Sequence, residues 1–532
     1  MTRVLSGSGV LLLLLVPAVA FCQEAPTSKP TPCPDDGGPI ELSASNWNGW
    51  GRDLENSHYQ PNPGLPLGDV SRLKVKWAFA YSGVKAGQPA VIGNRVYVSS
   101  ESGHVFALNA ATGCTYWSFA SAVPARTAVS IAPLPHSSAA RFAAFFGDEN
   151  ANVYALDAQT GKPLWKTQVD RHPISRITGS PVFYDNRLYV PVASYEEVSA
   201  AKPAYECCTF RGSLAALDAA TGKLIWQTYT IPEPPRPLRK NSSGTQMYGP
   251  AGGGIWAAPT VDPARKLLYA GTGDSYTDAE TKMTDAIVAF DLGKGAVKWS
   301  NQITPGDNWV VCAKPGEGNC PQNMGPDFDF GSSLILRKSV NGRAVLLAGQ
   351  KSGVIFALDA ENRGRILWQV KVGQGGSLGG IEWGIAADER NVYVPVSDVN
   401  VKSDPQPGLT ALQIATGKKL WHVPAPDAPC SWNPRTCSHS QAQAITVIPG
   451  VVFSGTQDGH LRAYATEDGA VLWDFDTAQK AWDTVNGIAA RGGILDGSGP
   501  SVANGMVYVN SGYGRMEGQP GSVLLAFSVD GK

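Results

Sequence analysis

Alternating apolar and polar residues recur along most of the chain in one short pattern. A strand of small apolar residues is followed by a polar turn with glycine, and then by a second strand that ends in tryptophan. The copies are ALNAATGCTYW (107–117), ALDAQTGKPLW (155–165), ALDAATGKLIW (216–226), AFDLGKGAVKW (289–299), ALDAENRGRILW (357–368), ALQIATGKKLW (411–421) and AYATEDGAVLW (463–473). Period-two alternation around a turn in which glycine supplies a positive φ predicts a β-hairpin. Each copy follows a Val/Tyr-rich strand such as RVYVSS or NVYVPV, so the repeat predicts a series of small antiparallel sheets.

The two ends of the chain supply an eighth copy of this pattern. The C-terminal segment VLLAFSVDGK (523–532) stops where the tryptophan strand should follow, and KVKWAF (74–79) is a tryptophan strand that lacks its partner. Pairing these two strands closes a ring of sheets and leaves no sheet with an open edge. We therefore predict an all-β fold, an eight-bladed β-propeller, over residues 46–532.

The tryptophans of the repeat stand at uneven intervals, from 40 residues (Trp77 to Trp117) to 73 residues (Trp226 to Trp299). A four-stranded blade needs only about 40 residues, so the longer intervals carry insertions, chiefly 195–212, 231–254 and 301–331. Insertions in a propeller emerge as loops on a face, where binding sites are built. We expect the tryptophans to pack between blades and the functional residues to gather in the inserted loops.

The N-terminus carries the pattern of an export signal. Arg3 precedes an apolar run over 10–21, which ends in the small-residue site Ala18-Val19-Ala20. This pattern predicts a signal peptide over residues 1–20, a linker over 21–45, and a periplasmic or secreted protein. The run falls short of the roughly 20 residues of a membrane helix, and no later segment is apolar enough to span a bilayer. Cys22 leaves lipidation open as an alternative.

Charge and cysteine content narrow the functional classes. The net charge of −1 provides no basic surface for nucleic acid or for an anionic membrane. The nine cysteines fit an oxidising compartment, although their connectivity cannot be deduced from sequence. No C-x-x-C-H occurs, so the chain encodes no attachment site for a c-type haem. Three cysteine pairs are close in sequence and a fourth pair could form from the remainder: Cys207 with Cys208, Cys312 with Cys320, Cys430 with Cys437, and Cys33 with Cys114.

The repeat A-x-D-x-x-T-G-x-x-x-W resembles the tryptophan-docking motif of alcohol dehydrogenases that depend on pyrroloquinoline quinone (PQQ). The stretch WNGWGRDLENSHYQPNPGLPLGDVSRLKVKW (47–77) is similar to the segment that opens the propeller of this family. ECCTFRGS, GGGIWAAPTVDP, the cysteine-bearing insertion after TPGDNW and the tail NSGYGRMEGQPGSVLLAFS (510–528) resemble its polyvinyl alcohol dehydrogenase branch. The resemblance covers about residues 45–530. It implies oxidation of an alcohol substrate with PQQ and Ca²⁺, and a soluble c-type cytochrome as the electron acceptor.

The resemblance also implies a set of binding residues. GGGIWAAPTVDPARKLLYAGTGDSY (252–276) is similar to the segment in which a glycine-rich loop and a tryptophan, here Gly254 and Trp256, lie under the quinone. The calcium ligand of that segment falls on Asp274, where the family usually has asparagine. ITGSPVFYDNRLYVPVASYEE (177–197) matches the strands that supply a threonine for the cofactor carboxylate, Thr178, and a glutamate for calcium. That glutamate is Glu196, with Glu197 as the alternative.

The catalytic base of the family follows a TP-x-D-x-W run, which reads ITPGDNW (303–309) here. An insertion interrupts the pattern, and it resumes as GPDFDFGSSLIL (325–336). The resemblance therefore implies that Asp327 is the base and a metal ligand, with Asp329 and Asp307 as nearby competitors. Lys351, in GQKSGVIFALD, matches the cation that contacts the quinone oxygens.

The family places an arginine and a pair of adjacent cysteines in one further segment. Arg126 in PARTAV lies in that region, but residues 130–131 are Ser-Ile here. The adjacent cysteines Cys207 and Cys208 come later, in the insertion YECCTFRG. They either form a lid over the quinone or pair separately with other cysteines. Arg211 follows them and either faces the cofactor or caps a strand.

Two alternatives compete with this interpretation. A non-catalytic propeller scaffold of the outer-membrane assembly type predicts even blade lengths and no acidic residues clustered in the insertions. Glu196, Asp274 and Asp327 all fall in or beside insertions, which favours the enzyme. The second alternative is a PQQ enzyme for a small primary alcohol, a sugar or an aldehyde. The additional carboxylate at Asp274 also leaves open a lanthanide in place of Ca²⁺.

Overall fold

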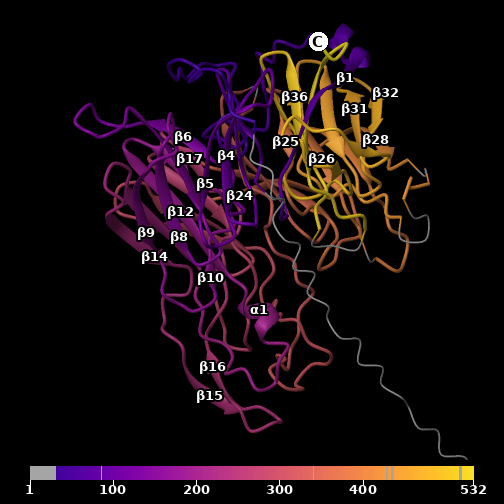
Figure 1. Ribbon diagram of the computed structural model, residues 1–532. Coiled ribbons are helices and arrows are strands. Elements are labelled where there is room, and N and C mark those ends of the chain that lie inside the picture. Colours follow the sequence, from indigo (N-terminus) through magenta and orange to yellow (C-terminus); the bar gives the residue numbers. More distant parts are fainter. Residues whose placement is uncertain are drawn as a thin grey trace, which may run out of the picture.

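Small antiparallel sheets arranged in a ring make up the computed structural model of this chain (Figure 1). The structure describes residues 31–84, 87–339, 341–399, 401–426, 429–432, 437–514 and 518–532. Within these ranges the ring contains seven four-stranded sheets and one five-stranded sheet, which confirms the predicted eight-bladed β-propeller. The predicted signal peptide over 1–20 and Cys22 lie outside the described residues.

The first four blades contain β2 (Ala90–Ile92), β3 (Arg95–Ser99), β4 (His104–Asn109) and β5 (Thr115–Ala120); β6 (Ser130–Pro133), β7 (Phe142–Gly147), β8 (Asn152–Asp157) and β9 (Pro163–Gln168); β10 (Ser175–Arg176), β11 (Val182–Tyr184), β12 (Arg187–Ser194), β13 (Ser213–Asp218) and β14 (Leu224–Tyr229); and β17 (Thr260–Asp262), β18 (Leu267–Gly271), β19 (Ala286–Asp291) and β20 (Val297–Gln302).

The other four contain β21 (Ile335–Lys338), β22 (Ala344–Gly349), β23 (Val354–Asp359) and β24 (Arg365–Lys371); β25 (Ala386–Ala387), β26 (Asn391–Val396), β27 (Gly408–Gln413) and β28 (Lys419–Pro424); β29 (Thr446–Ile448), β30 (Val451–Gly455), β31 (His460–Ala465) and β32 (Val471–Asp476); and β35 (Ser501–Ala503), β36 (Met506–Ser511), β37 (Val523–Val529) and β1 (Leu73–Ala80). Outside the blades lie η1 (Leu67–Arg72), α1 (Glu196–Ser199), and the hairpins β15 (Arg236–Lys240) with β16 (Gln246–Gly249) and β33 (Ala481–Trp482) with β34 (Ala490–Arg491).

The ring closes through the two ends of the chain. β1 pairs antiparallel with β37, and Trp77 lies opposite Ala526 in the register. The last blade therefore has the order β1-β37-β36-β35, as the sequence predicted. Because closure pairs the strand that each end would otherwise leave single, neither terminus exposes an unpaired ladder of backbone groups.

The repeat tryptophans lock each blade to the next one. The indole N–H of Trp77 donates to the carbonyl of Ala110 at 3.0 Å, and Trp473 donates to the carbonyl of Leu73 at 3.1 Å, across the junction that closes the ring. The indole rings also lie directly on the glycine of the neighbouring turn. A Cβ added to Gly295, for example, would lie 2.3 Å from the ring of Trp226. The tryptophans thus pack between blades, as predicted.

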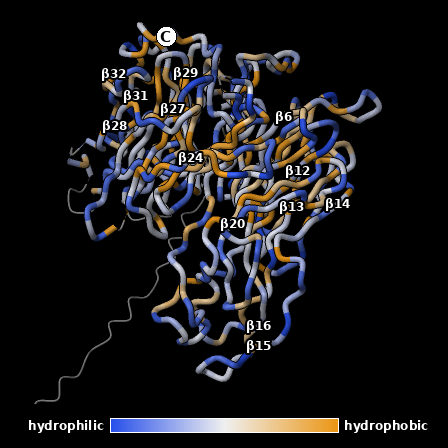
Figure 2. The backbone as a smooth tube through the Cα atoms, turned by 180° about the vertical axis from the view of Figure 1, so that it is seen from behind, coloured by the Kyte–Doolittle hydropathy of each residue, from blue (hydrophilic) through white to orange (hydrophobic). Residues whose placement is uncertain are grey.

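Burial follows the position of each strand within its blade. The inner strands are apolar on both faces because blades pack against each other on both sides, and every residue of β3 and β36 is buried. The outermost strands carry exposed side chains, among them Leu224, which is 44% exposed. Figure 2 shows this distribution, with hydrophobic colour concentrated in the blades.

The three predicted insertions lie together on one face of the ring, where α1 and the β15–β16 hairpin extend away from the blades (Figure 1). Two asparagines link them. Asn241 Nδ2 donates to the carbonyl of Pro203 at 2.7 Å and to Asn319 Oδ1 at 2.8 Å. Asn319 Nδ2 in turn donates to the carbonyl of Tyr205 at 2.9 Å. Buried amides that satisfy one another in this way fix the relative positions of all three insertions.

Four disulfides stabilise the loops. The bridge between Cys33 and Cys114 attaches the segment that begins at Thr31 to the first blade, where Cys33 N–H donates to the carbonyl of Thr115 at 3.1 Å. The other three join neighbours in sequence, so all four proposed pairs form: Cys33–Cys114, Cys207–Cys208, Cys312–Cys320 and Cys430–Cys437. Along the stretches that the structure describes, we find no helix with the length and apolar character needed to cross a bilayer.

The contact between tryptophan and turn glycine makes a stability prediction. Gly295→Ala places a Cβ against Trp226 at a residue with φ of +70°. Both the strain and the displaced ring should destabilise the fold by about 2 kcal/mol or more. We expect a lower midpoint of thermal unfolding by calorimetry.

Gly293→Ala is the matched control for this prediction. Gly293 belongs to the same turn, and its added Cβ would meet nothing closer than 3.4 Å among the described residues. Equal midpoints for the two variants would contradict the role given to the tryptophan contact.

Candidate functional site

A cavity of about 190 Å³ opens on the face that carries the insertions and is lined by loops from several blades. Residues far apart in the sequence, from Arg126 to Tyr513, meet in its wall. Six residues predicted from the sequence lie in its wall: Arg126, Thr178, Gly254, Trp256, Asp274 and Lys351.

Two tryptophans form an aromatic wall of the cavity. The rings of Trp256 and Trp383 meet edge to face, with centroids 5.6 Å apart and planes at 84°. Gly331 permits this position, since a Cβ there would lie 2.0 Å from the Trp256 ring. Cations flank both rings: Lys351 Nζ lies 5.4 Å from the Trp256 centroid, and the guanidinium of Arg126 lies 5.3 Å from that of Trp383. The wall therefore offers a flat aromatic face beside fixed positive charges.

Opposite charges gather at one end of this wall. Lys351 Nζ donates to Asp327 Oδ1 at 2.7 Å and to Asp329 Oδ2 at 3.0 Å. Carboxylate oxygens of Asp274, Asp327 and Asp329 lie within 4.8 Å of one another. Asp329 also accepts the backbone N–H of Asp274 at 2.9 Å, yet neither oxygen of the Asp274 side chain has a hydrogen-bond partner among the described residues. A buried carboxylate without a partner indicates a place for a cation.

The electrostatics of the cluster agree with this geometry. Burial raises the pKa of Asp274 well above its ordinary value, and the nearby charges of Asp329 and Asp327 raise it further. Burial and Asp329 raise the pKa of Glu197 to about 7. Burial would lower the pKa of Lys351, but the two aspartates outweigh it and hold that pKa well above the ordinary value. One ammonium group thus serves several carboxylates, and a divalent cation among them would relieve the remaining repulsion.

Two further aspartates lie next to the cluster. Asp307 accepts the backbone N–H groups of Asp327 at 3.0 Å and of Phe328 at 2.8 Å, and so supports Asp327 in a backbone conformation with φ of +64°. Asp285 is fully buried, and its carboxylate has no hydrogen-bond partner within the described part of the chain. Oxygen atoms of Asp274, Asp285 and Asp307 also lie within 4.8 Å of one another. Through its hydrogen bonds to the backbone of Asp327 and Phe328, Asp307 holds Asp327 in position beside the cluster.

The geometry shifts one predicted ligand by a single residue. Glu196, the first residue of α1, is fully buried, and its carboxylate accepts the Tyr205 hydroxyl at 3.0 Å and the backbone N–H groups of Thr209 and Phe210 at 2.9 and 2.8 Å. It does not line the cavity, whereas Glu197 does. Successive helical residues point in different directions, so only one of the two can face the site. Of the two candidates from the sequence, Glu197, the alternative, therefore faces the cavity, and Glu196 does not.

Four other predicted site residues do not line the cavity. Arg211 donates to the carbonyl of Pro232 at 2.9 Å, in the insertion that carries the β15–β16 hairpin. Cys207 and Cys208 are joined to each other and fully buried, and their backbone groups bond to Tyr248 in the same insertion. A lid of these cysteines over the cavity is not what the structure contains, because they pack within the inserted segments. Asp327 is likewise not part of the wall, where Asp329 takes its place.

Sequence analysis missed several residues of the wall, among them Arg176, Glu382, Trp383 and Tyr513. Two of them carried a signal. GGIEWGIAA (379–387) repeats the glycine-rich loop and tryptophan of GGGIWAAP (252–259), which could have identified Trp383 as a second aromatic plate. Arg176 stands two residues before Thr178, so both are placed on one side of an extended segment. Tyr513 stands in the family-like tail 510–528, but nothing in that motif marked it as a wall residue; its ring lies 5.9 Å from that of Trp383.

Comparisons with known proteins identify relatives of the whole chain. The family model for the glucose/ethanol/alcohol dehydrogenase β-propeller domain, the PQQ family, matches residues 47–315, and that for the outer membrane protein assembly factor BamB matches residues 351–516. A polyvinylalcohol dehydrogenase of Pseudomonas sp. is 49% identical over 93% of this chain and 79% of its own length. A polyvinylalcohol dehydrogenase of Sphingopyxis sp. is 47% identical over 96% of this chain and 79% of its own length.

Solved structures agree on the fold. The quinohemoprotein alcohol dehydrogenase of Comamonas testosteroni superimposes with a TM-score of 0.68 at 21% identity, covering 92% of this chain and 81% of that one. BamB of Moraxella catarrhalis reaches a TM-score of 0.52 at 15% identity, covering 86% of this chain and 99% of that one. At these identities the likeness concerns the propeller alone, so the family rests on the sequence relatives. Their identity over almost the whole chain, together with the matching family model, shows that this oxidoreductase belongs to the PQQ-dependent alcohol dehydrogenase family and is a homologue of the polyvinylalcohol dehydrogenases.

Proposed function

We propose that the chain oxidises alcohol groups, including the secondary alcohols of polyvinyl alcohol, with bound PQQ and Ca²⁺, and transfers the electrons to an external c-type cytochrome. The observation that carries the proposal is the cavity in which Trp256 adjoins Lys351 and the acidic cluster. The two relatives of nearly half identity support the polymer as substrate. The secretory pattern at the N-terminus and the four disulfides support an oxidising compartment such as the periplasm.

The wall residues fit PQQ in their chemistry. PQQ is a planar ortho-quinone with several carboxylates, and when bound it accepts a hydride from the alcohol carbon. Trp256 provides a flat face for the ring system. Arg126, Arg176 and Thr178 line the cavity as donors for carboxylates. Lys351 places a permanent positive charge beside the Trp256 ring, where it would stabilise negative charge on the quinone oxygens.

The acidic cluster fits Ca²⁺, which prefers several oxygen ligands. Glu197 and Asp274 line the cavity, and Asp274 has both oxygens unengaged by any described residue. Asp329 completes this wall beside them, and Asp327 lies within reach of the same ion. A metal at this position would act as a Lewis acid towards an adjacent carbonyl oxygen.

The proton of the alcohol requires a base near the same point. We assign this role to Asp327, since GPDFDFGSSLIL (325–336) resembles the segment that carries the base in the family. Lys351 engages Oδ1 of Asp327 and Asp307 holds its backbone N–H, which leaves Oδ2 to accept the hydroxyl proton. Asp329 is the competitor for this role because it belongs to the cavity wall.

Reconstitution tests the proposal as a whole. Purified protein incubated with PQQ and Ca²⁺ should take up the cofactor, measured by absorbance, and reduce a dye with polyvinyl alcohol or short secondary alcohols. Removal of Ca²⁺ with a chelator should abolish turnover, and Ca²⁺ should restore it. Absence of cofactor uptake together with inactivity towards every alcohol would refute the proposal. Activity with primary alcohols, sugars or aldehydes alone would refute the polymer as substrate.

Amide variants separate the two candidate bases. Asp327→Asn removes the proton acceptor with little change in shape, so turnover should fall by about a hundredfold or more while PQQ uptake is retained. Asp329→Asn should lower turnover less, because it keeps that acceptor. The comparison is made from kcat at saturating Ca²⁺. The reverse order would transfer the role to Asp329.

A second pair of variants tests the metal ligands. Glu197→Gln should raise the Ca²⁺ concentration for half-maximal activity by roughly tenfold, because a cavity carboxylate is lost. Glu196→Gln is the matched control, and should lower the midpoint of thermal unfolding without changing the Ca²⁺ dependence, because its contacts lie within the insertion. A Ca²⁺ dependence altered only in Glu196→Gln would return the ligand role to Glu196.

A further inference from the structure

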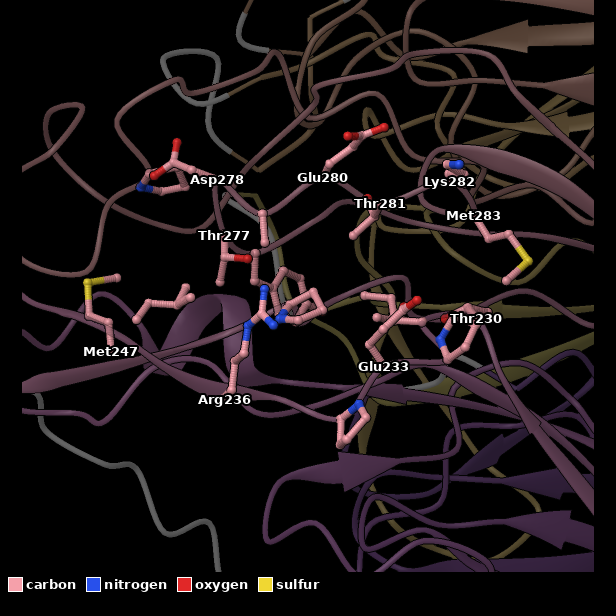
Figure 3. Close-up of a pocket in the computed structure, with 18 of the residues that line it drawn as sticks. Thr230, Glu233, Arg236, Met247, Thr277, Asp278, Glu280, Thr281, Lys282 and Met283 are labelled. Carbon is pink, nitrogen blue, oxygen red and sulfur yellow. The ribbon is translucent and has the colours of Figure 1, made fainter.

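A second and larger hollow adjoins the candidate active site. It has a volume of about 890 Å³ and lies between the β15–β16 hairpin with the segment before it and the loop over 277–283 (Figure 3). Ligand pockets of proteins commonly measure roughly 300–1,000 Å³, so this groove is at the upper end. The cavity with the acidic cluster, at about 190 Å³, has room for much less.

The groove and the cavity share a wall. Tyr276 lines both, and the next residue, Thr277, lines the groove. Thr277 is 2% exposed, and within the described residues its hydroxyl has no hydrogen-bond partner. An unpaired buried hydroxyl at this boundary can donate to or accept from a hydroxyl of a ligand. The groove therefore adjoins the cavity at Tyr276, and Thr277 offers a ligand chain a polar contact at this boundary.

The lining of the groove suits an uncharged ligand. Its acidic and basic side chains are equal in number among the described residues that line it: Glu233, Asp278 and Glu280, against Arg236, Arg239 and Lys282. This balance offers no net field for a polyanion or a polycation. Apolar side chains, including Leu238, Met247 and Met283, also line the groove. A lining that combines apolar and hydrogen-bonding groups suits an uncharged ligand that carries both.

The walls of the groove are held in place by the third insertion. The carboxylate of Asp278 accepts the backbone N–H groups of Gln322 at 3.0 Å and of Asn323 at 2.9 Å. From the opposite wall, Arg239 donates to the carbonyl of Cys320 at 3.2 Å. The two walls are thus connected through one segment, and the groove is preformed. A preformed site loses less conformational entropy when a flexible chain binds.

From these features we propose that the groove binds a segment of a neutral polymer whose backbone alternates methylene and secondary-alcohol carbons, while one unit of the same chain reaches the cavity. The inference rests on the proposed function, and it assigns recognition of the polymer to residues remote from the reacting atoms. The groove contributes to the KM for long substrates and leaves the oxidation of a single small alcohol unchanged.

Two variants remove this contribution in different ways. Ala279→Trp fills the groove from the loop over 277–283, and Leu238→Asp adds a charge to its apolar surface; both residues line it. Leu420→Asp is the matched control, because Leu420 is 44% exposed, as Leu238 is, but belongs to β28 and does not line the groove. The midpoint of thermal unfolding is measured for every variant to verify folding.

The PQQ-loaded, Ca²⁺-containing protein is assayed with polyvinyl alcohol and with pentane-2,4-diol, and binding of polyvinyl alcohol is measured by calorimetry without a dye. Both groove variants should raise the KM for the polymer and weaken its binding by about tenfold. Their kcat/KM for the diol should stay that of the wild type, as should all constants of Leu420→Asp.

Three results would overturn the assignment, and they are distinguishable. If the wild type oxidises the polymer and the groove variants behave like Leu420→Asp, the groove has no part in polymer binding while the proposed function stands. If the wild type oxidises no alcohol, the proposed function fails and the groove assignment fails with it. An equal loss for polymer and diol would place the effect in the cavity and also refute the assignment.

Discussion

The contact of each repeat tryptophan with the glycine turn of the next blade is the constraint on which the whole molecule depends. An indole ring that lies on a bare backbone leaves no space for a side chain, as the positions of Trp226 and Gly295 illustrate. A hydrogen bond from Trp473 to the carbonyl of Leu73 joins the neighbouring blade to the first strand of the ring. Because the blades are held so closely, their number and orientation are fixed. The blades differ from one another mainly in the loops between their strands, and the site is built from those loops.

Those loops carry a charge arrangement that the protein alone does not balance. The ammonium group of Lys351 is shared by Asp327 and Asp329, and the carboxylate of Asp274 has no hydrogen-bond partner among the described residues. Burial and mutual repulsion raise the carboxyl pKa values of Asp274 and Glu197. Apolar residues would pack at this place at lower electrostatic cost. A buried cluster of charges such as this one is typical of a binding site. Family membership and the chemistry of the cavity thus agree.

Much of the architecture could be predicted from the sequence, since it follows from periodicity. Alternation and the T-G turns gave the blades, and the two incomplete copies gave the closure between β1 and β37. The site was predicted where motifs were continuous, as at Trp256 and Lys351. The sequence left Glu196 and Glu197 as alternatives, because the short helix α1 has no periodic neighbour to set its phase, and the structure places Glu197 in the cavity wall. Trp383 was missed although its loop repeats the glycine-rich pattern before Trp256, because the two loops lie far apart in the sequence.

The two linked asparagines have a consequence for how such an enzyme changes its substrate. Asn241 and Asn319 bind one insertion to the other two, so none of the three can be exchanged without leaving buried amides unpaired. The three insertions therefore form one structural unit that is attached to the ring of blades. Engineers who graft a new specificity onto this scaffold would have to transplant the three loops together, and natural divergence faces the same linkage.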